Sequence, residues 1–166
     1  MNLALRKNII KMLEDYQKST QQIALLRYEI AHPQEISHRE MMESMIFARG
    51  EGNARMPQGY VSDKTYYIAM NYQDKADELN RERNTTLSEQ LLRLERRLDR
   101  LKHSVYQLST ERGAVIRGIY FDGKGYKELA AELHLSERTI QRYKEVAIDD
   151  LTMMYEVLHN AGVAFA

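Results

Sequence analysis

The sequence contains no cysteine, only two prolines and no excess of charge of either sign. The absence of cysteine excludes disulfides, thiol chemistry and cysteine-ligated zinc. With so few prolines, and with many Leu, Met, Glu, Lys, Arg and Gln residues, the 166-residue chain is predicted to be mostly helical. A formal net charge of zero neither favours nor excludes a polyanionic partner. The composition therefore predicts an all-α protein, and its partners must be inferred from local motifs.

Long apolar runs and the motifs of common enzymes are also missing. No run approaches the length of a membrane span, and residues near Met1 lack a signal-peptide core, so we expect a cytoplasmic protein without membrane contact. There is no phosphate loop, no paired metal-ligand motif and no nucleophile beside a base, so we expect no enzyme, cofactor or metal. His32 and His38 flank a proline without a carboxylate at helical spacing, which favours solvated histidines over metal ligands.

The first thirty residues carry a heptad pattern. Between residues 3 and 31 there is neither Gly nor Pro, and Pro33 closes the segment. Steps of four and three join Leu5, Ile9, Met12, Tyr16, Ser19, Ile23, Leu26 and Ile30. Such a seam needs a partner helix, which is either a later helix of this chain or a second copy.

A second heptad seam follows in the middle of the chain. It consists of Leu87, Leu91, Leu94, Leu98, Leu101, Val105 and Leu108. Seven apolar residues in alternating steps of four and three predict a coiled-coil-like hairpin or bundle with the first seam. The basic residues between them form either a solvated face or a phosphate-contacting stripe; these are Arg93, Arg96, Arg97, Arg100 and Lys102.

Capping signals predict the ends of the intervening helices. Ser37 and Glu40 form a capping box before a short amphipathic helix, and Ser62 with Asp63 can begin the next one. We know of no chemical role for residues 62–65. Thr86 and Glu89 form another box after the poor helix formers at residues 84–86, which predicts a break or kink there.

Residues 126–146, YKELAAELHLSERTIQRYKEV, predict two short helices joined by a three-residue turn. Leu129 and Leu133 share one face of the first helix. Ser136 can cap the second helix, in which Ile140 and Tyr143 face inward. This is the helix-turn-helix pattern, although an ordinary helical hairpin would show the same local features. His134 occupies the turn position where a left-handed backbone often requires Gly, and His tolerates that conformation at some cost.

A preceding support helix completes a trihelical domain. Ser109 is expected to cap a helix that runs to about Tyr120, and a turn follows at residues 122–125. The predicted core contains Leu108, Val115, Ile116, Ile119, Leu129, Leu133, Leu135, Ile140 and Tyr143. We therefore expect a helical oligomerisation region at residues 1–108 and a helix-turn-helix domain at residues 109–166.

The segment LSTERGAVIRGIYFDGKGYKELAAELHLSERTIQRYKEVAIDDL, residues 108–151, resembles region four of bacterial sigma factors. Its "Glu-Leu-Ala" and "Leu-Ser-x-x-Thr-Ile" elements carry that likeness. The upstream stretch MPQGYVSDKTYYIAMNY, followed by a charged heptad helix, is interpreted as not sigma-like. The combination resembles small phage and prophage transcriptional regulators of the ArpU and RinA type, over roughly residues 40–155.

The resemblance implies a sequence-specific regulator, expected to be an activator, of phage late genes in a bacterial host cell. Double-stranded DNA would be its partner and RNA polymerase a possible second one, with a homodimer formed through the heptad helices. The helix at residues 137–147 would enter the major groove. Carried over by position, the DNA-facing residues are Ser136, Glu137, Arg138, Gln141, Arg142 and Lys144, with Lys124 and Lys127 beside the motif.

The charge of the proposed domain argues against tight binding by one copy. From Ser109 onward there are seven Lys or Arg residues against nine Asp or Glu residues, whereas DNA-binding domains commonly carry a basic excess. Two other functions stay open at this point. One is a small terminase subunit for DNA packaging, and the other is a helical adaptor that contacts RNA polymerase without binding DNA.

Overall fold

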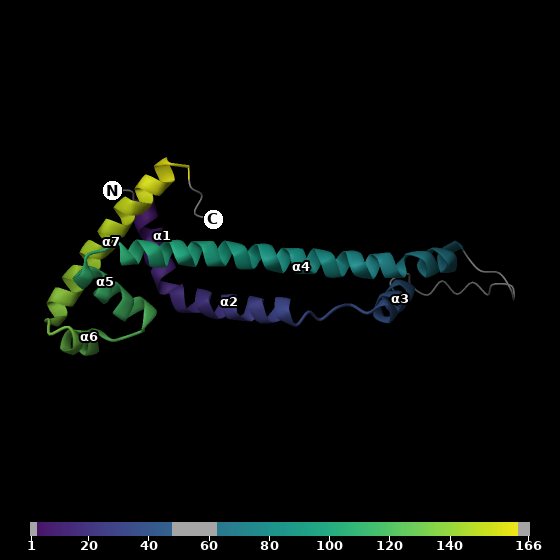
Figure 1. Cartoon of the computed structure of the whole chain (residues 1–166), viewed down its shortest axis with the longest axis horizontal. Helices are drawn as coiled ribbons and strands as arrows, with labels where there is room; N and C mark the ends of the chain where they lie inside the picture. Colours follow the sequence, from purple (N-terminus) through teal and green to yellow (C-terminus); the bar gives the residue numbers. More distant parts are fainter. Residues whose placement is uncertain (1–2, 48–62, 163–166) are drawn as a thin grey trace. The chain divides into compact units, whose positions relative to one another are not determined.

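The computed structural model describes residues 3–47 and 63–162. Every regular element in these two ranges is helical, so the predicted all-α class is confirmed (Figure 1). The chain divides into two compact units. One contains residues 26–90, and the other combines residues 1–25 with residues 91–166.

The N-terminal heptad segment forms two helices instead of one. Helix α1 spans Leu3–Glu14 and α2 spans Tyr16–Ala31, with Asp15 between them. The Asp15 N–H still donates to the Lys11 carbonyl (2.9 Å), and its carbonyl accepts from Ser19 (2.8 Å). The chain therefore changes direction at Asp15 while this residue keeps both of its backbone hydrogen bonds, and no Gly or Pro marks the site (Figure 1).

Helix α4 is continuous over Asp63–Tyr106, so of the predicted break or kink at residues 84–86 the break is absent. Thr86 does not cap a new helix, because its hydroxyl donates back to the Glu82 carbonyl (2.9 Å) one turn earlier. Each weak helix former destabilises a helix by only up to about 0.7 kcal/mol relative to Ala. This penalty is too small to interrupt a long helix that continues on both sides of these residues. The cap predicted at Ser62 lies outside the described residues.

The unit of residues 26–90 brings the end of α2, helix α3 (His38–Phe47) and the first part of α4 together. The Asn80 side chain exchanges two hydrogen bonds with the backbone of Ile36 (2.9 and 3.1 Å). Arg83 donates to the Gln34 carbonyl (2.7 Å) and pairs with Glu29 on α2 (3.4 Å). The capping box of Ser37 and Glu40 is present, with the Glu40 carboxylate accepting from the Ser37 N–H at 2.9 Å.

The heptad seams are used at least partly within the chain. In the other unit, the Lys102 ammonium lies 5.9 Å from the centre of the Tyr16 ring, which connects α4 to the start of α2. Ile23, Leu98 and Leu101 are buried. Some positions of both heptad segments are therefore covered within one chain, and the pairing of the two seams with each other stays a prediction.

The C-terminal region contains three further α-helices and a π-helical turn. Helix α5 spans Thr110–Ile116, η1 spans Arg117–Phe121, α6 spans Tyr126–Glu132 and α7 spans Glu137–Asn160. Ser109 occupies the N-cap position of α5, but its hydroxyl makes no capping hydrogen bond, contrary to the prediction. The expected single helix to Tyr120 ends in η1, where the Asp122 N–H donates to the Arg117 carbonyl five residues earlier (2.9 Å).

The predicted core divides into two clusters, and the adjacent α5 residues Val115 and Ile116 belong to different ones. Val115 packs with Leu129, Ala130 and Ile140, flanked by Ile119, Leu133, Leu135 and Tyr143. Ile116 instead joins a larger cluster from α1, α4, α7 and the segment just after α4: Leu5, Ile9, Met12, Leu13, Leu101, Val105, Leu108, Ala147, Ile148, Leu151 and Tyr155. Residues 109–166 therefore share most of their core with helices outside that segment. Their assignment as a separate DNA-binding domain stays a prediction.

Candidate nucleic-acid interface

The turn between α6 and α7 has a defined hydrogen-bonding pattern. The Leu135 N–H donates to the Ala130 carbonyl (2.9 Å), and the His134 N–H donates to the Ala131 carbonyl (3.4 Å). These two bonds make a Schellman motif, which requires a left-handed residue directly after the helix. His134 is that residue, with φ +53°, as its sequence position predicted. Leu135 packs against the cluster that contains Leu129 and Ala130, so the turn closes on an apolar contact.

The left-handed backbone at His134 leads to a stability prediction. We expect the free energy of unfolding of His134→Gly to be about 1 kcal/mol larger than that of His134→Ala. The reason is that a Cβ atom makes the left-handed region unfavourable, and Gly has no Cβ atom. The His134 side chain is exposed, so neither change removes core packing. Urea denaturation followed by circular dichroism measures the difference. An Ala variant as stable as the Gly variant would contradict the assignment of strain to this residue.

Ser136 is the N-cap of α7, and its side chain accepts a hydrogen bond from the Thr139 N–H (3.1 Å). The predicted N-cap is therefore confirmed. Ile140 and Ala147 on α7 are completely buried, and Tyr143 is partly buried beside them. Since residues three and four apart share a helix face, this buried stripe fixes which side of α7 is exposed.

The structure places six of the eight predicted site residues at the surface. Ser136, Glu137, Arg138, Gln141, Arg142 and Lys127 are all exposed. Arg138 and Arg142 are one turn apart on α7, and the Arg142 guanidinium lies 5.6 Å from the centre of the Tyr143 ring. Within the described ranges, the side chains of Arg138, Gln141 and Arg142 have no hydrogen-bond or ion-pair partner. The first turns of α7 thus present donors that no other group of the described residues engages.

The other two predicted residues, Lys124 and Lys144, are already paired. Lys124 donates to Glu132 on α6 (2.7 Å), and this hydrogen bond raises the pKa of its ammonium group. Lys144 donates to the hydroxyl of Tyr126 on α6 (3.1 Å). Burial lowers the pKa of Lys144, but the hydrogen bond with Tyr126 and neighbouring negative charge more than compensate and leave it raised. Both lysines therefore tie elements of the turn region together.

Three acidic residues of α7 pair with arginines from other helices. Asp149 and Glu145 both accept from Arg6 of α1, and Asp150 accepts from Arg112 of α5. The compact unit that includes α7 also contains α1 and the basic end of α4. Counted over that whole unit, sixteen lysines and arginines face thirteen aspartates and glutamates. The acidic excess seen from Ser109 onward becomes a small basic excess in the folded unit.

Sequence reasoning missed Arg6 and Arg112 as part of this region. The two carboxylates that Arg6 contacts lie 139 and 143 residues away along the chain. Local helical spacing carries no signal for contacts at that separation. In the two described ranges there is no cluster of three potential metal ligands, and none of the helices there is long and apolar enough to cross a membrane.

Comparison with known proteins identifies a family. The family model for the ECF sigma factor matches residues 68–153, just over half of the chain. The match begins in α4, far upstream of residue 108, so the interpretation of the charged heptad helix as not sigma-like is wrong. No curated protein and no solved structure matches the chain. The chain belongs to the ECF sigma factor family.

Proposed function

We propose that the chain is a sequence-specific DNA-binding regulator of transcription, in which residues 137–147 of α7 enter the major groove. The observation that carries this proposal is the exposed set Arg138, Gln141 and Arg142, which has no hydrogen-bond or ion-pair partner among the described residues. These side chains stand on a helix whose start is held by the α6–α7 turn. Membership of the ECF sigma factor family supports the same function. We infer no enzymatic activity.

The chemistry of these side chains suits base recognition. An arginine can donate two hydrogen bonds to guanine, and a glutamine can bond adenine in the same bidentate manner, each discriminating by about 1–3 kcal/mol. Ser136 and Glu137 at the start of α7, with Lys127 on α6, would lie toward the flanking bases or phosphates. Lys124 and Lys144 support the geometry of the turn, because their ammonium groups are bonded to α6.

The small basic excess of the folded unit suggests moderate affinity for a single copy. A second contact would increase the overall affinity for DNA, and this contact would be made either with RNA polymerase or with another copy of the chain. We retain the homodimer as a proposal, but a dimer would need a surface other than the buried parts of the heptad seams, since Ile23, Leu98 and Leu101 are covered within the chain.

The regulated genes are a finer proposal. The resemblance of residues 40–155 to phage regulators of the ArpU and RinA type leads us to propose activation of late phage genes in a bacterial cytoplasm. Binding of the chain to fragments upstream of packaging, structural or lysis genes would support it, and consistent binding elsewhere would contradict it.

The first test is a selection of bound genomic fragments followed by mutation of α7. We expect Arg138→Ala/Arg142→Ala to weaken binding of the selected fragment by at least about 30-fold, since two bidentate contacts are lost. The matched control is Lys11→Ala/Lys18→Ala, which removes the same charge from exposed positions of the same compact unit. Fluorescence anisotropy at fixed salt measures both. Equal affinities of the two double variants would overturn the assigned interface, and polymerase co-purification without any DNA retention would indicate an adaptor.

A further inference from the structure

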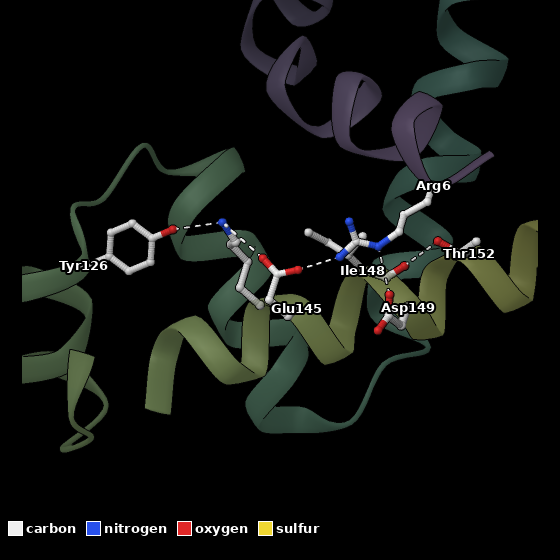
Figure 2. Close-up of polar contacts among 7 residues, drawn as sticks. Arg6, Tyr126, Glu145, Ile148, Asp149 and Thr152 are labelled. Atoms are coloured by element: carbon white, nitrogen blue, oxygen red, sulfur yellow. Dashed lines mark hydrogen bonds and ion pairs between the residues drawn. The ribbon is translucent and has the colours of Figure 1, made fainter. Parts of the chain in front are cut away.

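Arg6 connects α1 to the exposed side of α7. Its Nε donates to Asp149 Oδ1 (3.0 Å), and its Nη2 donates to Glu145 Oε2 (Figure 2). The Arg6 side chain is 22% exposed, so it is largely enclosed even though both carboxylates reach solvent. The hydrogen bonds with Asp149 and then Glu145 raise the pKa of the guanidinium, which is charged at every working pH.

The contact extends from α7 to α6. Glu145 Oε1 lies 3.8 Å from Lys144 Nζ, which donates to the Tyr126 hydroxyl at 3.1 Å (Figure 2). A continuous series of polar contacts therefore joins Tyr126 on α6, Lys144 and Glu145 on α7, and Arg6 on α1. Glu145 is the member that two cations hold from different sides.

Glu145 also lies next to the proposed base-reading residues. It follows Arg142 by three residues, and residues at that spacing are neighbours on a helix surface. A carboxylate at this position can pair with Arg142 unless another cation holds it. Glu145 and Asp149 are themselves one turn apart, so their like charges repel each other when no cation is shared between them.

We propose that Arg6 is a positioning residue for DNA recognition, which keeps Glu145 away from Arg142 and so leaves Arg142 available to the bases. This inference rests on the proposed DNA-binding function and deepens it. Arg6 does not itself contact DNA. When Arg6 is lost, Glu145 turns toward Arg142 and competes with guanine for its donors, and the uncompensated charge of Asp149 stays close to the phosphate backbone.

The test compares variants of the full chain on two DNA fragments of equal length, the fragment selected by the wild-type chain and a scrambled version. The measured quantity is the ratio of the two dissociation constants. We expect Arg6→Leu to lower this ratio about three- to tenfold. The control Lys7→Gln removes a neighbouring exposed charge from the same helix and should leave the ratio within about twofold of wild type.

Rescue separates positioning from a general structural role. In Arg6→Leu/Glu145→Gln the carboxylate that would capture Arg142 is gone, so the ratio should return to within about twofold of the Glu145→Gln single variant. Loss of packing around α1 would not be rescued by this change. Thermal unfolding confirms that each variant is folded. If Arg6→Leu does not fold, the same comparison is made with Arg6→Gln and the double variant Arg6→Gln/Glu145→Gln.

Two results would overturn the inference about Arg6 and leave the proposed DNA-binding function standing. One is a ratio of dissociation constants in the folded Arg6 variant equal to that of Lys7→Gln. The other is a decrease of that ratio that persists undiminished in the double variant. If the wild-type chain enriches no fragment and both dissociation constants are equal, the proposed function fails, and this inference fails with it.

Discussion

Residues 109–166 produced alone are expected to show no cooperative unfolding transition. The segment contains Ile116, Ile148 and Leu151, but their cluster is completed by residues of α1 and the end of α4. Removing those helices exposes one whole side of α5 and α7, and a three-helix segment with half a core lacks the buried area for independent stability. Thermal unfolding followed by circular dichroism measures this, with a broad, non-sigmoidal change as the expected result.

The matched control retains both parts of the compact unit. In this control variant, a Gly/Ser linker replaces residues 26–90, so that residues 1–25 and 91–166 remain. We expect a cooperative transition, because every residue of the larger core cluster is present. A sharp transition in the 109–166 fragment, equal to that of the control, would show that α1 contributes nothing to the fold of this region.

The second large effect is expected for Leu13→Ala. Leu13 is completely buried, and it lies in α1 within the cluster that holds α7. Truncating a fully buried leucine removes its transfer free energy and leaves a cavity, so the free energy of unfolding should fall by about 2–5 kcal/mol. Leu25→Ala is the control, because Leu25 is 66% exposed and its truncation should change stability by less than about 0.5 kcal/mol.

Urea denaturation at equilibrium measures both leucine variants. A large loss in Leu13→Ala would show that the N-terminal helix is part of the folded unit of α7. Equal stability of the two variants would indicate that α1 detaches at little cost, and it would remove the physical basis for the arrangement of Arg6 as well.

Local features of the fold were predictable from the sequence because their causes are local. The capping box of Ser37 and Glu40, the N-cap at Ser136 and the left-handed residue at His134 each depend on side chains within a few positions. Thr86 shows where such signals fail, since a capping residue inside a continuous helix can bond to the carbonyl one turn earlier. The π-helical turn of η1 had no recognised signal.

Contacts between distant segments were not predictable in this way. Heptad spacing indicates that Leu5 and Ile9 are buried, but it does not show which helix covers them. In the structure they pack in one cluster with residues of α7 and α4, and this cluster does not extend along α2. For the proposed interface, spacing separated the exposed Arg138 and Arg142 from the buried Ile140. It could not show that Lys144 is bonded to Tyr126 or that Arg6 holds Glu145.

The packing of α1 on α7 also has a consequence during translation. Residues 5–13 leave the ribosome well before their partners at residues 147–155, and synthesis of the intervening chain takes roughly 7–30 s. During that interval the apolar face of α1 has no native partner, whereas contacts such as Arg83 with Glu29 can already form. This long sequence separation raises the contact order of the unit and should make its closure the slow step of folding. A nascent chain halted before residue 147 would expose Ile9 and Leu13 to chaperones that bind apolar segments.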